Sequence, residues 1–113
     1  SDIRPIYDIL MVGNADVSDN KIYFTAVFES NQSAKLLGLS SSNVKHYVDG
    51  TAGTISGFTY NSATGKYSFT PSGSITTSSD VIVDLYDTVN SVAVAEVDGK
   101  YYKGTTTKFN PVA

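Results

Sequence analysis

The sequence predicts an all-β fold, an antiparallel β-sandwich of seven or eight short strands in one domain that covers residues 1–113. Three observations predict it. Apolar and polar residues alternate with a period of two in several separate segments, as they do in strands with one buried face. Clusters of Gly, Asn, Asp and Pro interrupt these segments about every ten residues. Helical periodicity is almost absent. A closed barrel is the alternative architecture for the same pattern.

The first strand is predicted in residues 3–12, which are apolar on both faces after Pro5. Proline suits the start of a strand or a sheet edge because it cannot donate to the ladder. The next segment alternates clearly, with Ile22, Phe24 and Ala26 on one face and Tyr23 on the other. The same alternation predicts the remaining strands at residues 43–48, 58–60, 66–70, 80–87, 91–97 and 100–107.

The connections are predicted from their turn residues. Asp98 and Gly99 form a two-residue loop that requires positive φ angles, so a tight hairpin is expected there. Residues 61–66 predict a longer hairpin. Only residues 33–39 contain a run of helix formers, and Gly38 limits them to about two helical turns. A loop across one end of the sandwich is the alternative for this segment.

Composition and charge exclude several classes of function. The net charge is −3, with 8 Lys and Arg against 11 Asp and Glu, and no basic cluster exists to neutralise phosphates. Nucleic-acid binding is therefore not expected. No apolar run reaches the roughly 18 residues of a membrane span. The absence of Cys removes disulfides, thiolate catalysis and Cys-based zinc sites.

Four segments carry a resemblance to a known family. They are residues 21–28 (KIYFTAVF), 44–50 (VKHYVDG) and 60–71 (YNSATGKYSFTP), and the hairpin at residues 98–99. Together they resemble the immunoglobulin-like repeat domains of prokaryotic surface proteins. The resemblance implies an immunoglobulin-like sandwich, an extracellular location at the cell surface, and a structural or adhesive role. It carries over no catalytic residue.

No catalytic constellation is predicted, so the chain is not expected to be an enzyme. His46 is the only histidine, and it alternates with Val44 and Val48, which predicts a packed, hydrogen-bonded strand residue rather than a base. Asp84 and Asp87 are three residues apart and point to different faces of a strand, which is unsuited to a paired acid and base.

Neither a metal nor a cofactor is predicted. Asp16, Asp19 and Asn20 cluster in one turn and could ligate calcium, but their spacing matches no complete EF-hand loop. Solvated turn residues that bond their own backbone are the favoured interpretation.

Tyrosine provides the candidate binding residues, since the chain has 8 Tyr and no Trp. Tyr101 and Tyr102 are adjacent in a strand, so their side chains point to opposite faces and at least one is expected outside. Exposed tyrosines, with Tyr60, Tyr101 and Tyr102 as candidates, would serve a glycan- or protein-binding adhesion module.

Self-assembly is the leading functional hypothesis. The first segment carries more apolar surface than one face of a sandwich needs. Such a strand either lies in the middle of a sheet or adds to a neighbouring copy or domain, and for strand addition the candidate residues are Ile3, Ile6, Ile9 and Met11. The sequence thus predicts a non-catalytic building block of a surface layer, stalk or filament; a viral decoration domain is a variant of this hypothesis. Asn31 begins an Asn-X-Ser tripeptide and is a candidate glycosylation site.

Overall fold

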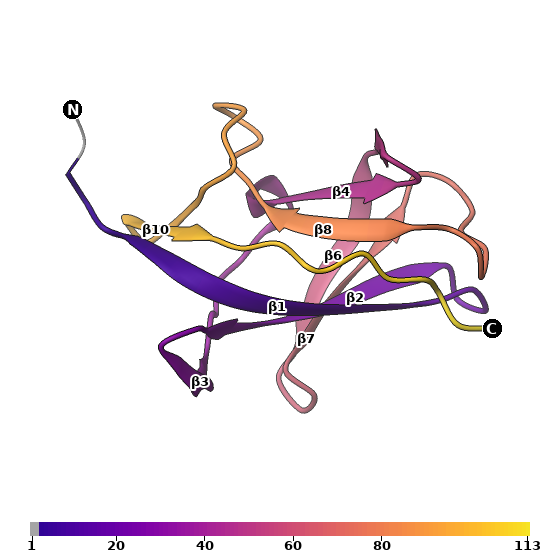
Figure 1. Ribbon diagram of the computed structural model, residues 1–113, viewed down its shortest axis with the longest axis horizontal. Helices are drawn as coiled ribbons and strands as arrows, with labels where there is room; N and C mark the ends of the chain where they lie inside the picture. Colours follow the sequence, from indigo (N-terminus) through magenta and orange to yellow (C-terminus); the bar gives the residue numbers. More distant parts are fainter. Residues whose placement is uncertain (1–2) are drawn as a thin grey trace.

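The computed structural model describes residues 3–113, and it confirms that the fold is all-β (Figure 1). Residues 1 and 2 lie outside the described part of the chain. The described residues form ten strands and one short 3₁₀ helix, η1. In chain order these are β1 (Ile6–Asp16), β2 (Lys21–Phe28), β3 (Asn31–Lys35), η1 (Ser41–Asn43), β4 (Val44–Val48), β5 (Thr51–Ala52), β6 (Ile55–Asn61), β7 (Lys66–Pro71), β8 (Val81–Leu85), β9 (Ala95–Val97) and β10 (Lys100–Lys103).

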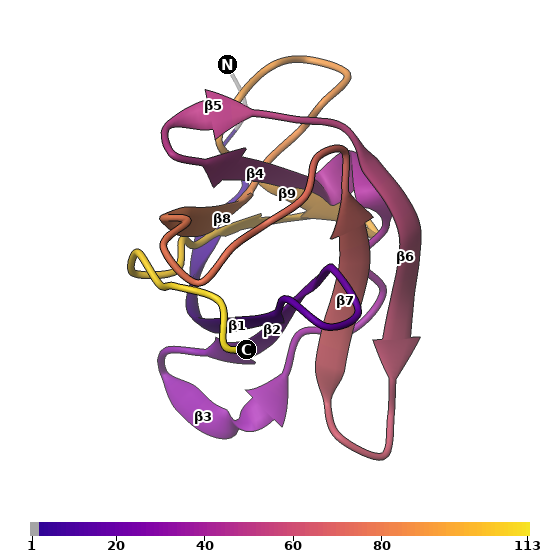
Figure 2. The ribbon, with the colours of Figure 1, turned by 90° about the vertical axis from the view of Figure 1, so that its right-hand side faces the viewer.

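The strands form a large curled sheet and a small one. The large sheet has the order β6-β7-β2-β1-β10-β9, with β3 also paired to β2, and the small sheet has the order β5-β4-β8. Figure 2 shows the large sheet curving from β6 and β7 through β2 and β1 toward the side where β4 and β8 lie. Only antiparallel pairing was expected, but β1 and β10 pair in parallel, so the large sheet is mixed.

Strand β1 changes its hydrogen-bonding partner along its length. Residues 6–8 pair with β10, and residues 9–16 pair in antiparallel register with β2. The chain after β10 then links the two sheets. Phe109 and Val81 of β8 exchange backbone hydrogen bonds of 2.8 and 2.9 Å, and Val112 donates to the carbonyl of Ala15 on β1 at 2.8 Å. In Figure 1 this C-terminal segment runs alongside β8 and β1. Strand β1 is therefore an interior strand of the sheet.

The core lies between the two sheets and follows the predicted alternation. Ile22, Phe24 and Ala26 of β2 are buried, as are Tyr67 and Phe69 of β7. The rings of Phe24 and Tyr67 stack with centroids 5.1 Å apart. The small sheet contributes Val44, His46, Val81, Val83 and Leu85. Burial of apolar surface at about 25 cal/mol per Å² is the main source of stability.

The segment at residues 33–39 is neither a helix nor a simple loop. Its first residues belong to β3, and residues 36–39 have no regular secondary structure, with a φ of 85° at Gly38. Leu36 and Leu39 are buried, and the buried Tyr67 hydroxyl donates to the Leu36 carbonyl at 2.7 Å. The Leu36 amide donates to the carbonyl of Ala26 at 2.9 Å. These tertiary hydrogen bonds replace the local ones of a helix, so packing overrides the propensity of the segment.

The other differences are in the number and the boundaries of the strands: the short strands β3 and β5 were not predicted, which makes ten strands where seven or eight were expected. The strand expected at residues 91–97 contains only Ala95–Val97. The preceding loop is held by Asp87, whose carboxylate accepts hydrogen bonds from the amides of Val89 and Asn90 at 2.9 and 3.0 Å. The predicted hairpin is confirmed: β9 pairs with β10, and Asp98 and Gly99 have φ angles of 50° and 77°.

Candidate functional site

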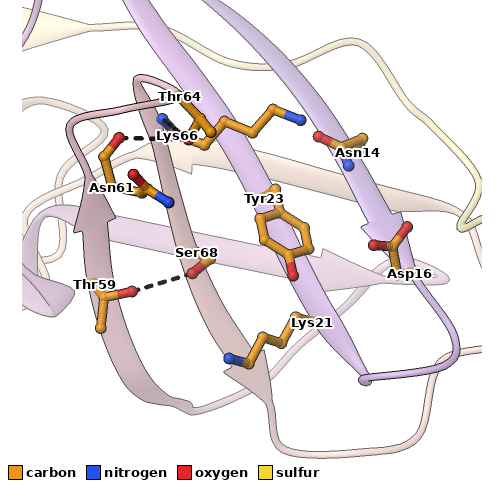
Figure 3. Close-up of a pocket in the computed structure, with 9 residues that line it drawn as sticks. All are labelled: Asn14, Asp16, Lys21, Tyr23, Thr59, Asn61, Thr64, Lys66 and Ser68. Atoms are coloured by element: carbon orange, nitrogen blue, oxygen red, sulfur yellow. Dashed lines mark hydrogen bonds between the residues drawn. The ribbon is translucent and has the colours of Figure 1, made fainter.

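A polar hollow of about 480 Å³ lies on the outer surface of the large sheet (Figure 3). Four strands build it. Asn14, Tyr23, Ser68 and Thr59, from β1, β2, β7 and β6, are successive register partners and form one row across the sheet. Their neighbours along the strands project inward to the core, so this row projects to solvent. We call the lined surface the Tyr23 face; its residues are Asn14, Asp16, Lys21, Tyr23, Thr59, Asn61, Thr64, Lys66 and Ser68.

The ring of Tyr23 is the only aromatic group that lines this face. Figure 3 shows it broadside at the centre, with Asn14 and Asp16 on one side and Ser68 on the other. Its hydroxyl donates a hydrogen bond of 2.6 Å to the carboxylate of Asp19, in the turn before β2. That hydrogen bond, with desolvation and the negative charges of Asp19 and Asp16, raises the pKa of Tyr23 to about 12. The hydroxyl is therefore neutral and oriented at physiological pH.

Charged groups of both signs surround the ring. Lys21 and Asp16 are register partners, as are Lys66 and Asn61, so these pairs flank the central row. The ammonium of Lys66 lies 5.9 Å from the centroid of the Tyr23 ring. Within residues 3–113, the side chains of Lys21, Lys66 and Asp16 take part in no ion pair. These charges are thus available to a ligand.

The polar neutral groups of the face divide into two sets. The hydroxyls of Thr59 and Ser68 lie 3.2 Å apart and hydrogen bond to each other, and the side-chain oxygen of Asn61 accepts from the Ala63 amide at 2.9 Å. The amide group of Asn14, by contrast, has no hydrogen-bond partner among the described residues. The face therefore combines one aromatic ring with hydrogen-bond donors and acceptors, of which Thr59, Ser68 and Asn61 are held by hydrogen bonds within the protein.

The three tyrosines predicted as binding residues do not come together. Tyr60 is half-buried on β6, and its ring packs against that of Tyr67 with centroids 4.6 Å apart. Tyr101 is half-buried on β10 under the guanidinium of Arg4, 4.0 Å from the ring centroid. Tyr102 is 7% exposed and packs against other aromatic rings. Strands β6 and β10 are well separated in the sheet, so the three rings do not form one platform.

The four predicted assembly residues fall into two groups. Ile3 is 93% exposed and Ile6 is 48% exposed, whereas Ile9 and Met11 are each 5% exposed and belong to the core. Contact with a neighbouring molecule through Ile9 or Met11 would require β1 to leave its sheet. The candidate glycosylation residue, Asn31, is exposed at the start of β3, and its side-chain oxygen accepts a hydrogen bond of 2.7 Å from the Ser33 hydroxyl.

His46 is packed as expected but lacks the expected hydrogen bond at one nitrogen. It is 1% exposed, and its ring lies 5.2 Å from that of Phe69. Its Nδ1 atom is buried and has no hydrogen-bond partner among residues 3–113. Burial lowers the pKa of His46 below its usual value of 6.5. The ring borders a cavity of about 180 Å³ that is also lined by Gly53 and Ser72.

The acidic turn before β2 serves the fold. The Asp19 carboxylate accepts from the Lys21 amide at 3.1 Å and from the Tyr23 hydroxyl. Asn20 accepts from the Ile75 amide at 2.9 Å and donates to the Gly73 carbonyl at 3.1 Å. No group of three or more His, Cys, Asp or Glu side chains in the described part of the chain is arranged to hold a metal ion.

Comparisons of this chain with protein-family models, with curated proteins and with solved structures give no match. No helix within residues 3–113 has the length and apolar character needed to cross a membrane.

Sequence reasoning missed Tyr23 as a site residue, although it assigned this side chain to the polar face of its strand. Alternation within β2 indicates that Tyr23 points outward. It does not indicate that β1 and β7 lie on either side of β2, or that their register brings Asn14 and Ser68 level with the ring. The signal in the sequence that could have indicated this surface is a run of polar residues at successive outward positions. Each of the three strands has one: Asn14 and Asp16 on β1, Lys21 and Tyr23 on β2, and Lys66 and Ser68 on β7.

Proposed function

We propose that this chain is a non-catalytic structural module of an extracellular, cell-surface assembly, with an immunoglobulin-like sandwich fold. The order of the strands supports the fold. β1, β2, β7 and β6 are neighbours in one sheet while β4 and β8 pair in the other, as the ABED and CF strands do in immunoglobulin domains. The C-terminal segment adds to β8 in antiparallel fashion at Phe109, which suits the last strand of that fold.

The positions of the two chain ends carry the proposal of a structural role. Figure 1 shows the start of the described part of the chain and the C-terminus toward opposite ends of the longest axis of the molecule, which extends 43 Å. Copies or neighbouring domains can therefore follow one another along this axis without a reversal of the chain. A head-to-tail contact of this kind joins two different surfaces, so it does not close as a two-fold dimer, and along a common axis it continues into an open array.

Exposed apolar side chains near both chain ends support contact between copies. Ile3 and Ile6 belong to the N-terminal part of the chain, and Val112, 58% exposed, belongs to the C-terminal part. Burial of such side chains between copies would stabilise the array at about 25 cal/mol per Å² of apolar surface. The extracellular location rests on the resemblance in residues 21–28 and 60–71.

The experiment compares the assembly of the purified protein with that of a variant altered at its N-terminal end. Light scattering after size exclusion, and electron microscopy over a range of concentrations, should detect linear arrays. The double variant Ile3→Ser, Ile6→Ser should form shorter arrays or none. Val89→Ser is the matched control, because Val89 is 82% exposed but lies in the β8–β9 loop.

A monomer at every concentration, or arrays that the double variant leaves unchanged, would contradict the proposal. Deletion of residues 1–12 is not a suitable test, because it would remove most of an interior strand together with Ile9 and Met11 of the core.

A second candidate function, adhesion through a binding face, is favoured by the Tyr23 face.

A further inference from the structure

The Tyr23 ring has the properties of a preorganised stacking platform. Strand β2 holds its backbone, and the 2.6 Å hydrogen bond to Asp19 holds its hydroxyl. The side chain therefore loses little conformational entropy when a ligand binds. Figure 3 shows the broad side of the ring turned toward the hollow. The face of an aromatic ring is its negative side and attracts weakly positive C–H groups. The ring therefore suits a ligand that presents a flat array of C–H bonds.

The groups around the ring suit a ligand that both donates and accepts hydrogen bonds. Lys21 and Lys66 are donors, Asp16 is an acceptor, and the amide of Asn14 can act as either. The central row crosses four strands, which spans three strand spacings of about 4.8 Å each. A ligand that covers the row must be longer than a single small ring and must carry hydroxyl groups along its length.

The balance of charge separates the possible ligand classes. Lys21, Lys66 and Asp16 line the face, the Asp19 carboxylate is bonded to the Tyr23 hydroxyl, and the whole chain carries a net charge of −3, so a polyanion gains little attraction here. An apolar ligand would desolvate the polar groups of the face without pairing them. An uncharged chain of hydroxyl-bearing rings meets both requirements.

We propose that the Tyr23 face binds an uncharged oligosaccharide, with one sugar ring stacked on Tyr23 and its hydroxyls bonded to Asn14, Asp16 and Lys66. This inference adds a binding activity to the proposed structural role and does not depend on assembly. A module in an array would then present one such face per copy, and weak binding at each face would be strengthened by multivalency.

The test begins with the intact protein on a glycan array that includes neutral, sialylated and sulfated chains. Gluco-, manno-, xylo- and chito-hexaoses are then titrated in solution by NMR, with the backbone amides of β1, β2 and β7 as reporters. Binding to one or more neutral chains is expected, with shifts concentrated at the Tyr23 face. Tyr23→Ala should lower the affinity by about tenfold or more, because it removes the platform.

Two further variants separate stacking from a general loss of structure. Tyr23→Phe keeps the ring and removes the hydroxyl, so it should keep the affinity to within a few-fold. Tyr47→Ala, at a half-buried tyrosine of the small sheet, is the matched control and should bind like the unaltered protein. If Tyr23→Ala does not fold, judged by its thermal unfolding transition, Asn14→Ala and Lys66→Ala replace it, and each should weaken binding severalfold.

Binding to no glycan, or only to anionic ones, overturns the proposal. Equal affinity of the unaltered protein and Tyr23→Ala also overturns it, as does a set of shifted amides away from the Tyr23 face. None of these results concerns the proposed assembly into arrays. A negative result for glycan binding and a negative result for assembly are therefore distinguishable.

Discussion

Acidification should destabilise this protein through His46. The imidazole is 1% exposed, and its Nδ1 atom has no hydrogen-bond partner in the part of the chain that the structure describes. Phe69 beside the ring and the residues that line the neighbouring cavity, Gly53 and Ser72 among them, are uncharged and cannot compensate an imidazolium. The proton must therefore enter a site that disfavours it, and the pKa of His46 is lower in the folded protein than its usual 6.5.

The sign of the effect follows from proton binding. Between the lowered folded pKa and 6.5, the unfolded chain binds a proton at His46 that the folded chain does not. The full stability is present above 6.5 and declines as the pH falls toward the folded pKa. For one proton the free energy of unfolding decreases by at most about 1.4 kcal/mol per pH unit. Below the folded pKa the contribution of His46 becomes constant again.

Urea unfolding followed by circular dichroism measures this dependence at several pH values between about 8 and about 5, where one histidine titrates. Because carboxylates also begin to titrate in this range, the informative quantity is the difference between the unaltered protein and His46→Leu, which has no titrating group. His46→Gln serves as a second, polar comparison. Parallel stability curves for all three proteins would refute the assignment of the acid sensitivity to His46.

Two packing predictions test other parts of the fold. Gly13→Ala should destabilise the protein by about 1–3 kcal/mol in urea unfolding, because a Cβ on Gly13 would overlap the ring of Phe109. Gly73→Ala is the control: a Cβ there would meet no atom within 4 Å, so the free energy of unfolding should change by less than about 0.5 kcal/mol. Tyr67→Phe should lower the free energy of unfolding by about 1–3 kcal/mol, because the buried Leu36 carbonyl would lose its 2.7 Å hydrogen bond. An unchanged midpoint of urea unfolding would contradict this prediction.

Most strands and turns could be predicted from the sequence because they depend on neighbours along the chain. Ile22 and Phe24 are buried and Tyr23 is outside because successive side chains in a strand point to opposite faces. The hairpin at Asp98 and Gly99 follows from residues that tolerate positive φ.

The predictions that differ from the structure concern segments whose neighbours are distant in sequence. Residues 33–39 contain helix formers, yet they form the end of β3 and an irregular segment, because Leu36 bonds to Ala26 and Tyr67 on other strands. For the apolar residues of β1 the sequence left two alternatives, a strand inside a sheet or one that adds to a neighbouring copy. Pairing with β2, β10 and the C-terminal segment places β1 inside the sheet, with Ile9 and Met11 in the core. Local pattern contains no information on these contacts.

The amino-acid sequence alone determined the all-β class, the side of each main strand that faces the core, and the tight turns, because backbone geometry over two to four residues dictates all three. Tertiary structure decided which strands are neighbours, and therefore which outward side chains share a surface. Tyr23, Asn14 and Ser68 form one row only because β1, β2 and β7 pair in a single register. That register is selected by packing of the whole core, to which residues from every part of the chain contribute.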